Sequence, residues 1–168
     1  MPLLIREAIH SDAQIVGGLI DAMDVHYRGA GNTGGAEAAA VMAARCLSEK
    51  EGTRFLIATI HGEAAGLACF AIIRPGRRHT GLLFLKDLFV VPHARSDGIG
   101  RALVAALARY AIDRSIGRID LTTDTANTGA QRLYDEIGGK RLAKVAYTFE
   151  EDALSSLAAS ASPLSSSS

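Results

Sequence analysis

The sequence lacks several features that would mark particular classes of protein. It contains no tryptophan, and only 5% of its 168 residues are aromatic, so a core has to be built mainly from Ala, Leu, Ile and Val. Lys plus Arg and Asp plus Glu each number 18, and this zero net charge argues against a general nucleic-acid binder or a polybasic membrane clamp. The apolar fraction of 48% is too high for a chain that is disordered throughout.

Cysteines and long apolar runs are also scarce. The two cysteines, Cys46 and Cys69, form no CxxC motif, and we expect both to be small hydrophobic residues in a reducing compartment. The longest run of apolar or small residues, 64–73, is far shorter than the ~18 residues that span a bilayer. No signal peptide is expected, because no basic N-terminal region precedes a long apolar run. These features predict a cytoplasmic protein without a membrane or nucleic-acid partner.

Hydrophobic periodicity predicts a single α/β domain with a mixed sheet over residues 1–154. The expected strands are residues 3–9, 55–60, 64–73, 82–91, 118–123 and 142–149. The expected helices are residues 11–26, 36–49, 98–115 and 126–137, with a short one after Glu150. His61-Gly62 predicts a tight hairpin, and Gly138-Gly139 predicts a helix end. The Ser- and Ala-rich segment 155–168 is predicted to be a disordered tail.

The most informative stretch is a strand, a short turn and a helix that begins at Gly98-Ile99-Gly100. Such a turn directs backbone N–H groups outward at the positive end of the helix dipole, which suits a pyrophosphate. Glycine matters here because a side chain would block the approach of the anion to the backbone. A dinucleotide motif would have glycine where this chain has Leu103, and a Walker loop would have Gly-Lys-Ser/Thr, so neither is indicated.

This stretch resembles the acyl-CoA signature of the GCN5-related N-acetyltransferase (GNAT) family, R/Q-x-x-G-x-G/A after a long central strand. Arg95, Gly98 and Gly100 occupy its defined positions. Residues 127–138 are similar to a second family motif, the helix N-x-x-A-x-x-L-Y-E-x-x-G. The resemblance extends over about residues 3–150 and implies a single-domain GNAT-like fold, with a mixed, mostly antiparallel sheet flanked by helices. The pattern is most similar to the diamine acetyltransferase branch.

The resemblance implies that acetyl-CoA is the co-substrate. The backbone of the central strand would contact the pantetheine and acetyl group, the following turn would wrap the pyrophosphate, and Asn127 would hold the pantetheine arm or simply cap its helix. Asp97 departs from the family pattern, and we expect it to point away from the diphosphate or to cap the helix. The expected cofactor-binding residues are Leu88, Phe89, Val90, Arg95, Ser96, Asp97, Gly98, Ile99, Gly100, Arg101, Asn127 and Ala130.

The implied reaction is direct attack of an amine on a thioester. Tyr134 is implied to stabilise the leaving thiolate by a hydrogen bond, since the phenol pKa of ~10 lies above the thiol pKa of ~8.5. Asp87 matches one of two adjacent carboxylates in the diamine branch, as base or substrate anchor, whereas Lys86 replaces the other. An ion pair with a structural role is the alternative for both residues. Because adjacent strand residues face opposite sides, Lys86 and Asp87 are expected on different faces.

The substrate is the least constrained part of the prediction. Lys86 disfavours a polyamine and suits a substrate with a carboxylate, such as an amino-acid derivative. His26 and Tyr27 are expected to form a substrate wall, with an ordinary surface helix end as the alternative. The five histidines show no metal-ligand spacing, so no metal is expected.

The sequence therefore predicts an N-acetyltransferase that acts on a small primary amine, amino-acid-like or polyamine-like. Homodimers are common in the family, and a homodimer is expected here. Two alternatives stay open: a non-catalytic acetyl-CoA-binding or regulatory module, and an enzyme that acetylates a protein N-terminus or lysine.

Overall fold

The computed structural model describes residues 3–48, 52–75 and 81–161. The chain divides into two compact units, Met1–Gly138 and Gly139–Ser168, whereas the sequence predicts a domain over residues 1–154. The strands of the first unit are β1 (Leu4–Glu7), β2 (Arg54–Ile60), β3 (Glu63–Ile73), β4 (Leu82–Val90) and β5 (Ile119–Leu121). Its α-helices are α1 (Ala13–Arg28), α2 (Ala36–Ser48), α3 (Ile99–Asp113) and α4 (Thr128–Glu136), with short 3-10 turns at His10–Asp12 and Pro92–Ala94.

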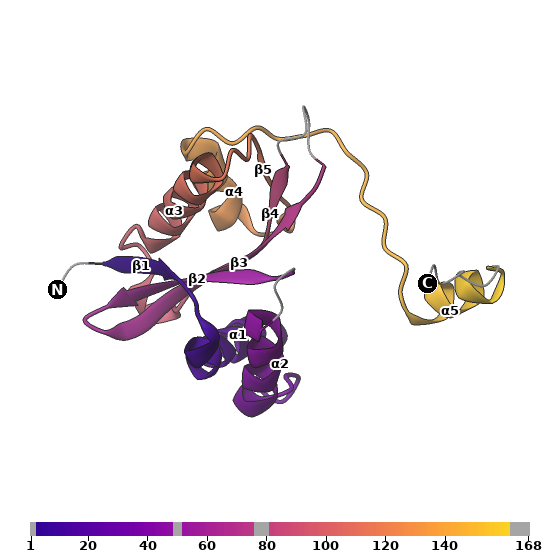
Figure 1. Ribbon diagram of the computed structural model, residues 1–168, viewed down its shortest axis with the longest axis horizontal. Coiled ribbons are helices and arrows are strands. Elements are labelled where there is room, and N and C mark those ends of the chain that lie inside the picture. The colour runs from indigo at the N-terminus through magenta and orange to yellow at the C-terminus, as the bar shows by residue number, and fades with distance from the viewer. Residues whose placement is uncertain (1–2, 49–51, 76–80, 162–168) are drawn as a thin grey trace. The chain divides into compact units, whose positions relative to one another are not determined.

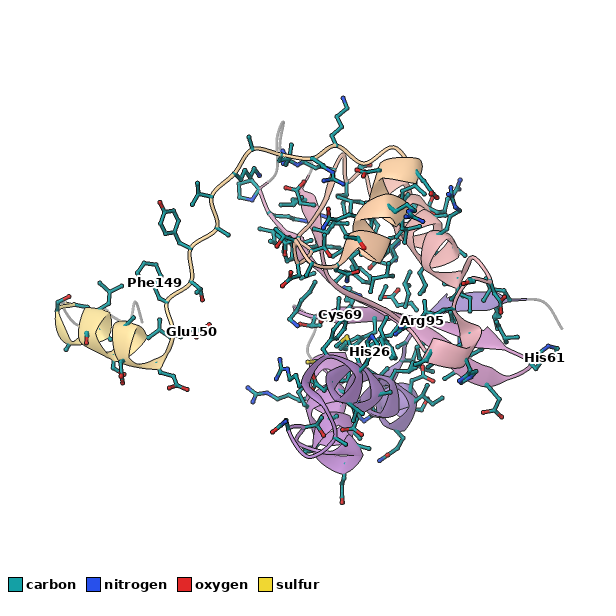
Figure 2. The ribbon with its side chains drawn as sticks, turned by 180° about the vertical axis from the view of Figure 1, so that it is seen from behind. His26, His61, Cys69, Arg95, Phe149 and Glu150 are labelled. Carbon is teal, nitrogen blue, oxygen red and sulfur yellow. The ribbon has the colours of Figure 1, made fainter. Side chains whose placement is uncertain are left out.

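The strands form one sheet in the order β1-β2-β3-β4-β5. The first four are antiparallel to their neighbours, and only β5 runs parallel to β4. The expected hairpin is confirmed: His61 and Gly62 have φ of 54° and 87°, as a two-residue turn between twisted strands requires. Figure 2 shows His61 at the tip of this hairpin. The α/β class and the mixed, mostly antiparallel sheet are therefore confirmed.

Helices cover both faces of the sheet: α1 and α2 lie on one side, and α3 and α4 lie on the other (Figure 1). The core between them contains three fully buried phenylalanines, Phe55, Phe70 and Phe89, among aliphatic residues. Helices α1 and α2 pack closely, since a Cβ at Gly17 would lie 2.5 Å from the backbone of Ala40. Among the described residues, no helix has the length and apolar character needed to span a membrane.

A partly buried ion pair joins β1 to the start of α1. Two nitrogens of the Arg6 guanidinium lie 2.6 and 2.7 Å from the two carboxylate oxygens of Asp12, and the Ile9 N–H donates to Asp12 at 2.7 Å. The hydrogen bonds from Arg6 lower the pKa of Asp12, despite the burial that opposes this shift. This carboxylate, 5% exposed, fixes the direction in which the chain enters α1.

The middle of β4 carries an irregularity that the sequence does not reveal. Asp87 pairs with Cys69 and Leu85 pairs with Phe70, so one extra residue, Lys86, stands in β4 between these pairs. The Lys86 ammonium lies 2.7 Å from the Asp87 carboxylate. The expectation that these two side chains lie on different faces is therefore wrong, because it assumes a regular strand.

The expected strand over residues 142–149 is also wrong. The described part of the second unit contains α5 (Glu151–Ala159) and no strand. Residues 142–149 have the alternation of a strand, but a strand needs a neighbour for its backbone groups, and residues 139–161 provide none. The short helix after Glu150 is confirmed, and it makes residues 155–159 of the expected tail helical. Residues 162–168 lie outside the described residues.

Candidate active site

The site lies where β4 and β5 separate. The two strands pair only from Leu83 and Ile119 to Leu85 and Leu121, although β4 continues to Val90. Beyond this point no strand of the described chain covers the β5 side of β4. The backbone of β4 is therefore open to a ligand along that side.

A groove of about 900 Å³ runs from the end of β4 over the start of α3 to α4. It contains every expected cofactor-binding residue except Asp97, which is exposed and does not line it. The groove is lined by Leu88, Phe89, Val90, Arg95, Ser96, Gly98, Ile99, Gly100, Arg101, Asn127 and Ala130, among others.

The start of α3 offers its backbone to this groove. Gly98 is the N-cap residue, with a left-handed φ of 76°, and no side chain caps the helix. The expected capping role of Asp97 is therefore wrong. The first amides of α3 stay available to an anion, at the positive end of a 15-residue helix. A Cβ at Gly100 would lie 3.4 Å from Leu133 of α4, so a larger side chain there would narrow the groove.

Two arginines of the groove are held by the protein. Arg95 donates from Nε to the Val90 carbonyl at 3.0 Å and lies over the Phe89 ring, 5.9 Å from its centroid. Arg101 on α3 forms an ion pair of 3.2 Å with Glu136 on α4. Both guanidiniums contribute positive charge to the groove, which Arg132 of α4 and the first backbone amides of α3 also line.

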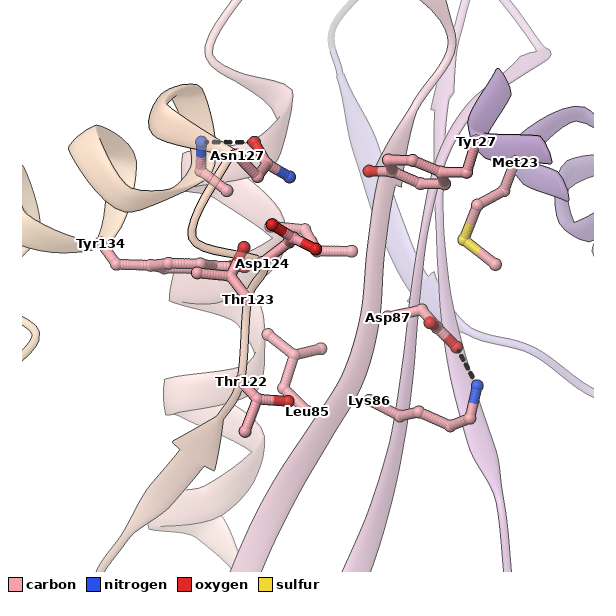
Figure 3. Close-up of a pocket in the computed structure, with 12 residues that line it drawn as sticks. Met23, Tyr27, Leu85, Lys86, Asp87, Thr122, Thr123, Asp124, Asn127 and Tyr134 are labelled. Atoms are coloured by element: carbon pink, nitrogen blue, oxygen red, sulfur yellow. Dashed lines mark hydrogen bonds and ion pairs between the residues drawn. The ribbon is translucent and has the colours of Figure 1, made fainter. Parts of the chain in front are cut away.

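A second, smaller cavity of about 220 Å³ opens beside the groove (Figure 3). Its polar lining comes from the bulge of β4, the loop after β5 and the end of α1. The residues that line both cavities mark where a group in the groove can meet a molecule in the small cavity. These shared residues are Tyr27, Leu88, Asp124, Asn127, Ala130 and Tyr134.

Lys86 and Asp87 both line the small cavity as an ion pair (Figure 3). The hydrogen bond to Asp87 raises the pKa of Lys86. Opposite Asp87 on β3, burial raises the pKa of the Cys69 thiol to about 12, with a smaller contribution from the Asp87 charge. Cys69 is therefore a neutral thiol rather than a nucleophile. Both cysteines are free, with Cys46 in α2 and Cys69 in β3.

Tyr134 and Asn127 lie at the junction of the two cavities. Burial raises the pKa of Tyr134, and Tyr27 adds to the shift, so the phenol keeps its proton at neutral pH and can donate a hydrogen bond. Asn127 caps α4, with its Oδ1 accepting from the Ala130 N–H at 3.1 Å. The cap uses only Oδ1, which leaves the amide NH₂ for a ligand.

His26 and Tyr27, the expected substrate wall, take different positions. Tyr27 lines both cavities, whereas His26 lines only the groove. The two rings meet edge to face at 5.0 Å, and the His26 ring lies 6.3 Å from that of Phe89. His26 on α1 and Arg95 in the turn after β4 both line the groove and are labelled in Figure 2.

The sequence reasoning missed Asp124 and the two threonines before it. Thr122, Thr123 and Asp124 follow β5 directly and line the small cavity. Asp124 holds a tight turn by accepting from the Ala126 N–H at 2.7 Å. The signal available in the sequence was an Asp placed three residues before the motif Asn127, at the end of a predicted strand.

Comparisons with known proteins agree with this geometry. The sequence profile of the acetyltransferase (GNAT) family matches residues 21–138. An uncharacterised N-acetyltransferase of Bacillus subtilis strain 168, YhfO, is 34% identical over 134 residues, which are 80% of this chain and 87% of that protein. The chain therefore belongs to the GNAT family of acetyltransferases.

Solved structures share the fold. The integron cassette protein VCH_CASS6, from the mobile metagenome of V. cholerae, superposes with a TM-score of 0.87 at 29% identity, over 95% of this chain and 99% of its own. The aminoglycoside N-acetyltransferase AAC(6')-Iy in complex with CoA has a TM-score of 0.73 at 20% identity, over 89% of this chain and 95% of its own. At this identity the second likeness shows the fold alone.

Proposed function

We propose that this protein transfers an acetyl group from acetyl-CoA to the primary amine of a small molecule by direct attack. The observation that carries the proposal is the junction of two cavities at Tyr134, Asp124 and Leu88. One cavity is an elongated groove that ends at an uncapped helix start, and the other is small and polar. A thioester in the first and an amine in the second would meet at this junction.

The groove fits the chemistry of acetyl-CoA, which supplies the acetyl group as a thioester when bound. The uncapped amides at the start of α3 and the guanidiniums of Arg95 and Arg101 suit its pyrophosphate. The NH₂ of Asn127 suits the amide groups of a pantetheine arm. Backbone donors of β4 suit the thioester carbonyl, because oxygen gains charge during the reaction.

The direction of these donors follows from the hydrogen bonds around Val90. The Val91 N–H donates to Ala65 of β3 at 3.0 Å, whereas the Val90 carbonyl accepts from Arg95 on the groove side. Backbone groups alternate in direction along a strand, so the N–H groups of Val90 and Leu88 point away from β3, into the groove. We infer that these two amides stabilise the carbonyl oxygen, whereas the amide of Phe89 belongs to the sheet.

The small cavity supports a compact, polar acceptor. Its volume of about 220 Å³ suits an amino-acid derivative or the end of a longer amine. Its charged lining is Lys86, Asp87 and Asp124, so it presents groups of both signs. An amino-acid-like or polyamine-like amine therefore remains the proposed substrate. An amino sugar that bears several amines is a further acceptor to test, because one protein with a similar fold is an aminoglycoside acetyltransferase.

The test is turnover by the full-length protein. Acetyl-CoA is offered with a panel of α-amino acids, lysine and its derivatives, linear diamines, an aminoglycoside and N-terminal peptides, and free CoA thiol is measured. We expect thiol release and an acetylated product with at least one small amine, and weaker turnover with peptides. Tight CoA binding without turnover of any amine would contradict the proposal and favour a binding module instead.

We also propose that the protein is a cytoplasmic homodimer. The free, buried thiol of Cys69 supports a reducing compartment. The second unit supports a dimer, because its described residues are all exposed and include large apolar side chains such as Tyr147, 84% exposed, and Phe149. An aromatic side chain buries on the order of 150–250 Å². Two copies of both rings therefore supply a large part of the roughly 1,200 Å² that a stable interface buries.

A further inference from the structure

We propose that Asp124, rather than Asp87, is the carboxylate that receives the acceptor amine. This inference rests on the proposed acetyl transfer and names the residue that positions the amine and takes the proton that its nitrogen loses after attack. Asp124 is not part of the acyl-CoA signature, and the sequence analysis does not place it in the site.

The first argument is location. An amine that attacks a thioester in the groove must lie at the junction of the two cavities. Among the described residues that line both cavities, Asp124 is the one carboxylate. Asp87 lines only the small cavity, and Glu136 lines only the groove. In Figure 3 the Asp124 carboxylate points into the space between Tyr134 on α4 and Tyr27 on α1.

The second argument is charge. The Asp87 Oδ2 lies 2.7 Å from the Lys86 ammonium, so its negative charge is already paired with a cation of the protein. Among the described residues of the first unit, none forms an ion pair with Asp124. Its Oδ1 accepts from the Ala126 N–H, and its Oδ2 stays available to a substrate.

The third argument is rigidity. The turn that carries Asp124 is fixed by Gln131 of α4, whose side-chain amide donates to the carbonyls of Asp124 at 3.1 Å and Thr125 at 2.8 Å. Together with the bond to Ala126, these contacts hold the carboxylate in place before substrate binds. A preorganised acceptor loses little freedom when the amine arrives.

The proton balance follows from these positions. The substrate ammonium binds to Asp124, and loss of one proton to water leaves a neutral amine there. The nitrogen lone pair forms the C–N bond, and the electrons of the C–S bond leave with sulfur, which accepts a hydrogen bond from Tyr134. The nitrogen now carries one proton too many and is far more acidic than the free ammonium, so Asp124 takes that proton and passes it to solvent. The thiolate takes up a proton from water.

The test compares two isosteric variants with the wild-type protein. Asp124→Asn keeps an oxygen acceptor for the Ala126 N–H and removes only the charge, so the turn is retained. We expect kcat/KM for the best amine of the panel to fall by about 10²- to 10⁴-fold. The Kd for acetyl-CoA, measured by calorimetry, should stay within about twofold of the wild-type value, since the charge is not needed in the groove. Asp87→Asn should reduce kcat/KM less than Asp124→Asn does.

Asp113→Asn, at the far end of α3, is the control for removal of a surface carboxylate and should not change kcat/KM. The inference would be overturned if kcat/KM of Asp124→Asn stayed within about threefold of the wild-type value, or if it fell less than that of Asp87→Asn. Turnover by the wild-type protein would still support acetyl transfer in that case. A wild-type protein that acetylates no amine would overturn both. Unfolding curves of the variants separate a catalytic loss from a folding defect.

Discussion

At the scale of single residues, the proposed reaction depends on groups whose protonation is set by their surroundings. Tyr134 keeps its proton because burial raises the pKa of its phenol. A hydrogen bond to a developing thiolate contributes more than one to a neutral group, about 1.5–3 kcal/mol. In the proposed reaction Tyr134 therefore acts as a hydrogen-bond donor, and full transfer of its proton is not required.

The first prediction concerns this donor. Tyr134→Phe should lower kcat by roughly 10- to 100-fold, since the lost hydrogen bond acts mainly in the transition state. The Kd for acetyl-CoA should change little, because the ring still fills its place between the cavities. Steady-state kinetics and calorimetry measure the two quantities. An unchanged kcat would remove Tyr134 from the mechanism.

The second prediction concerns the Arg6–Asp12 pair. The pKa of Asp12 is lowered in the folded protein, so its contribution to stability is full above the ordinary carboxyl pKa of ~3.9 and is lost as the pH falls through the lowered value. Asp12→Asn should therefore lower the free energy of unfolding at pH 7 by about 1–3 kcal/mol. The difference from wild type should shrink below pH ~4. Urea unfolding of both proteins at pH 7 and pH 3 measures it, and an equal loss at both pH values would contradict the linkage.

At the scale of elements, close approaches and irregularities decide where the site residues lie. The bulge in β4 brings Lys86 and Asp87 together, and the separation of β5 from β4 exposes the backbone of Val90. Both features depend on how neighbouring strands pair. Alternation along β4 alone could not predict them, because one extra residue reverses the faces that follow.

The third prediction uses two adjacent glycines of α1. A Cβ at Gly17 would lie 2.5 Å from the backbone of Ala40 on α2, whereas a Cβ at Gly18 would meet nothing within 4 Å. Gly17→Ala should thus destabilise the protein by about 1–3 kcal/mol through overpacking. Gly18→Ala should stabilise it by about 0.5–1 kcal/mol, because alanine favours a helix. Thermal and urea unfolding measure both, and the same sign for the two variants would refute the close packing of α1 on α2.

At the scale of the whole molecule, none of the residues 139–161 that the structure describes in the second unit is buried. Its large side chains Val145, Tyr147 and Phe149 alternate with smaller or polar ones, and all of residues 142–149 are exposed. Exposed apolar surface of this extent marks an interaction site, and a second copy of the chain is the occupant that we propose. Two identical chains would cover each other's segments reciprocally.

The fourth prediction tests this surface. Replacement of Val145, Tyr147 and Phe149 by Ser in the full-length chain should shift the protein from dimer to monomer in sedimentation or light-scattering measurements. Ile112→Ser, which changes an apolar residue of α3 that is 69% exposed, is the matched control and should leave the dimer intact. A wild-type protein that is monomeric at micromolar concentration, or a triple variant that still dimerises, would count against the proposal.

The sequence by itself determined the fold class, the strands and helices of the first unit and many of the residues that line the groove, although not Asp97. It could do so because these features depend on local periodicity, turn residues and two motifs with fixed spacing. Tertiary structure alone decided the rest: the bulge at Lys86, the uncapped start of α3, the position of Asp124 and the failure of residues 142–149 to form a strand. Each of these depends on which segments meet in space, and the local sequence pattern of one segment does not encode which other segments lie next to it.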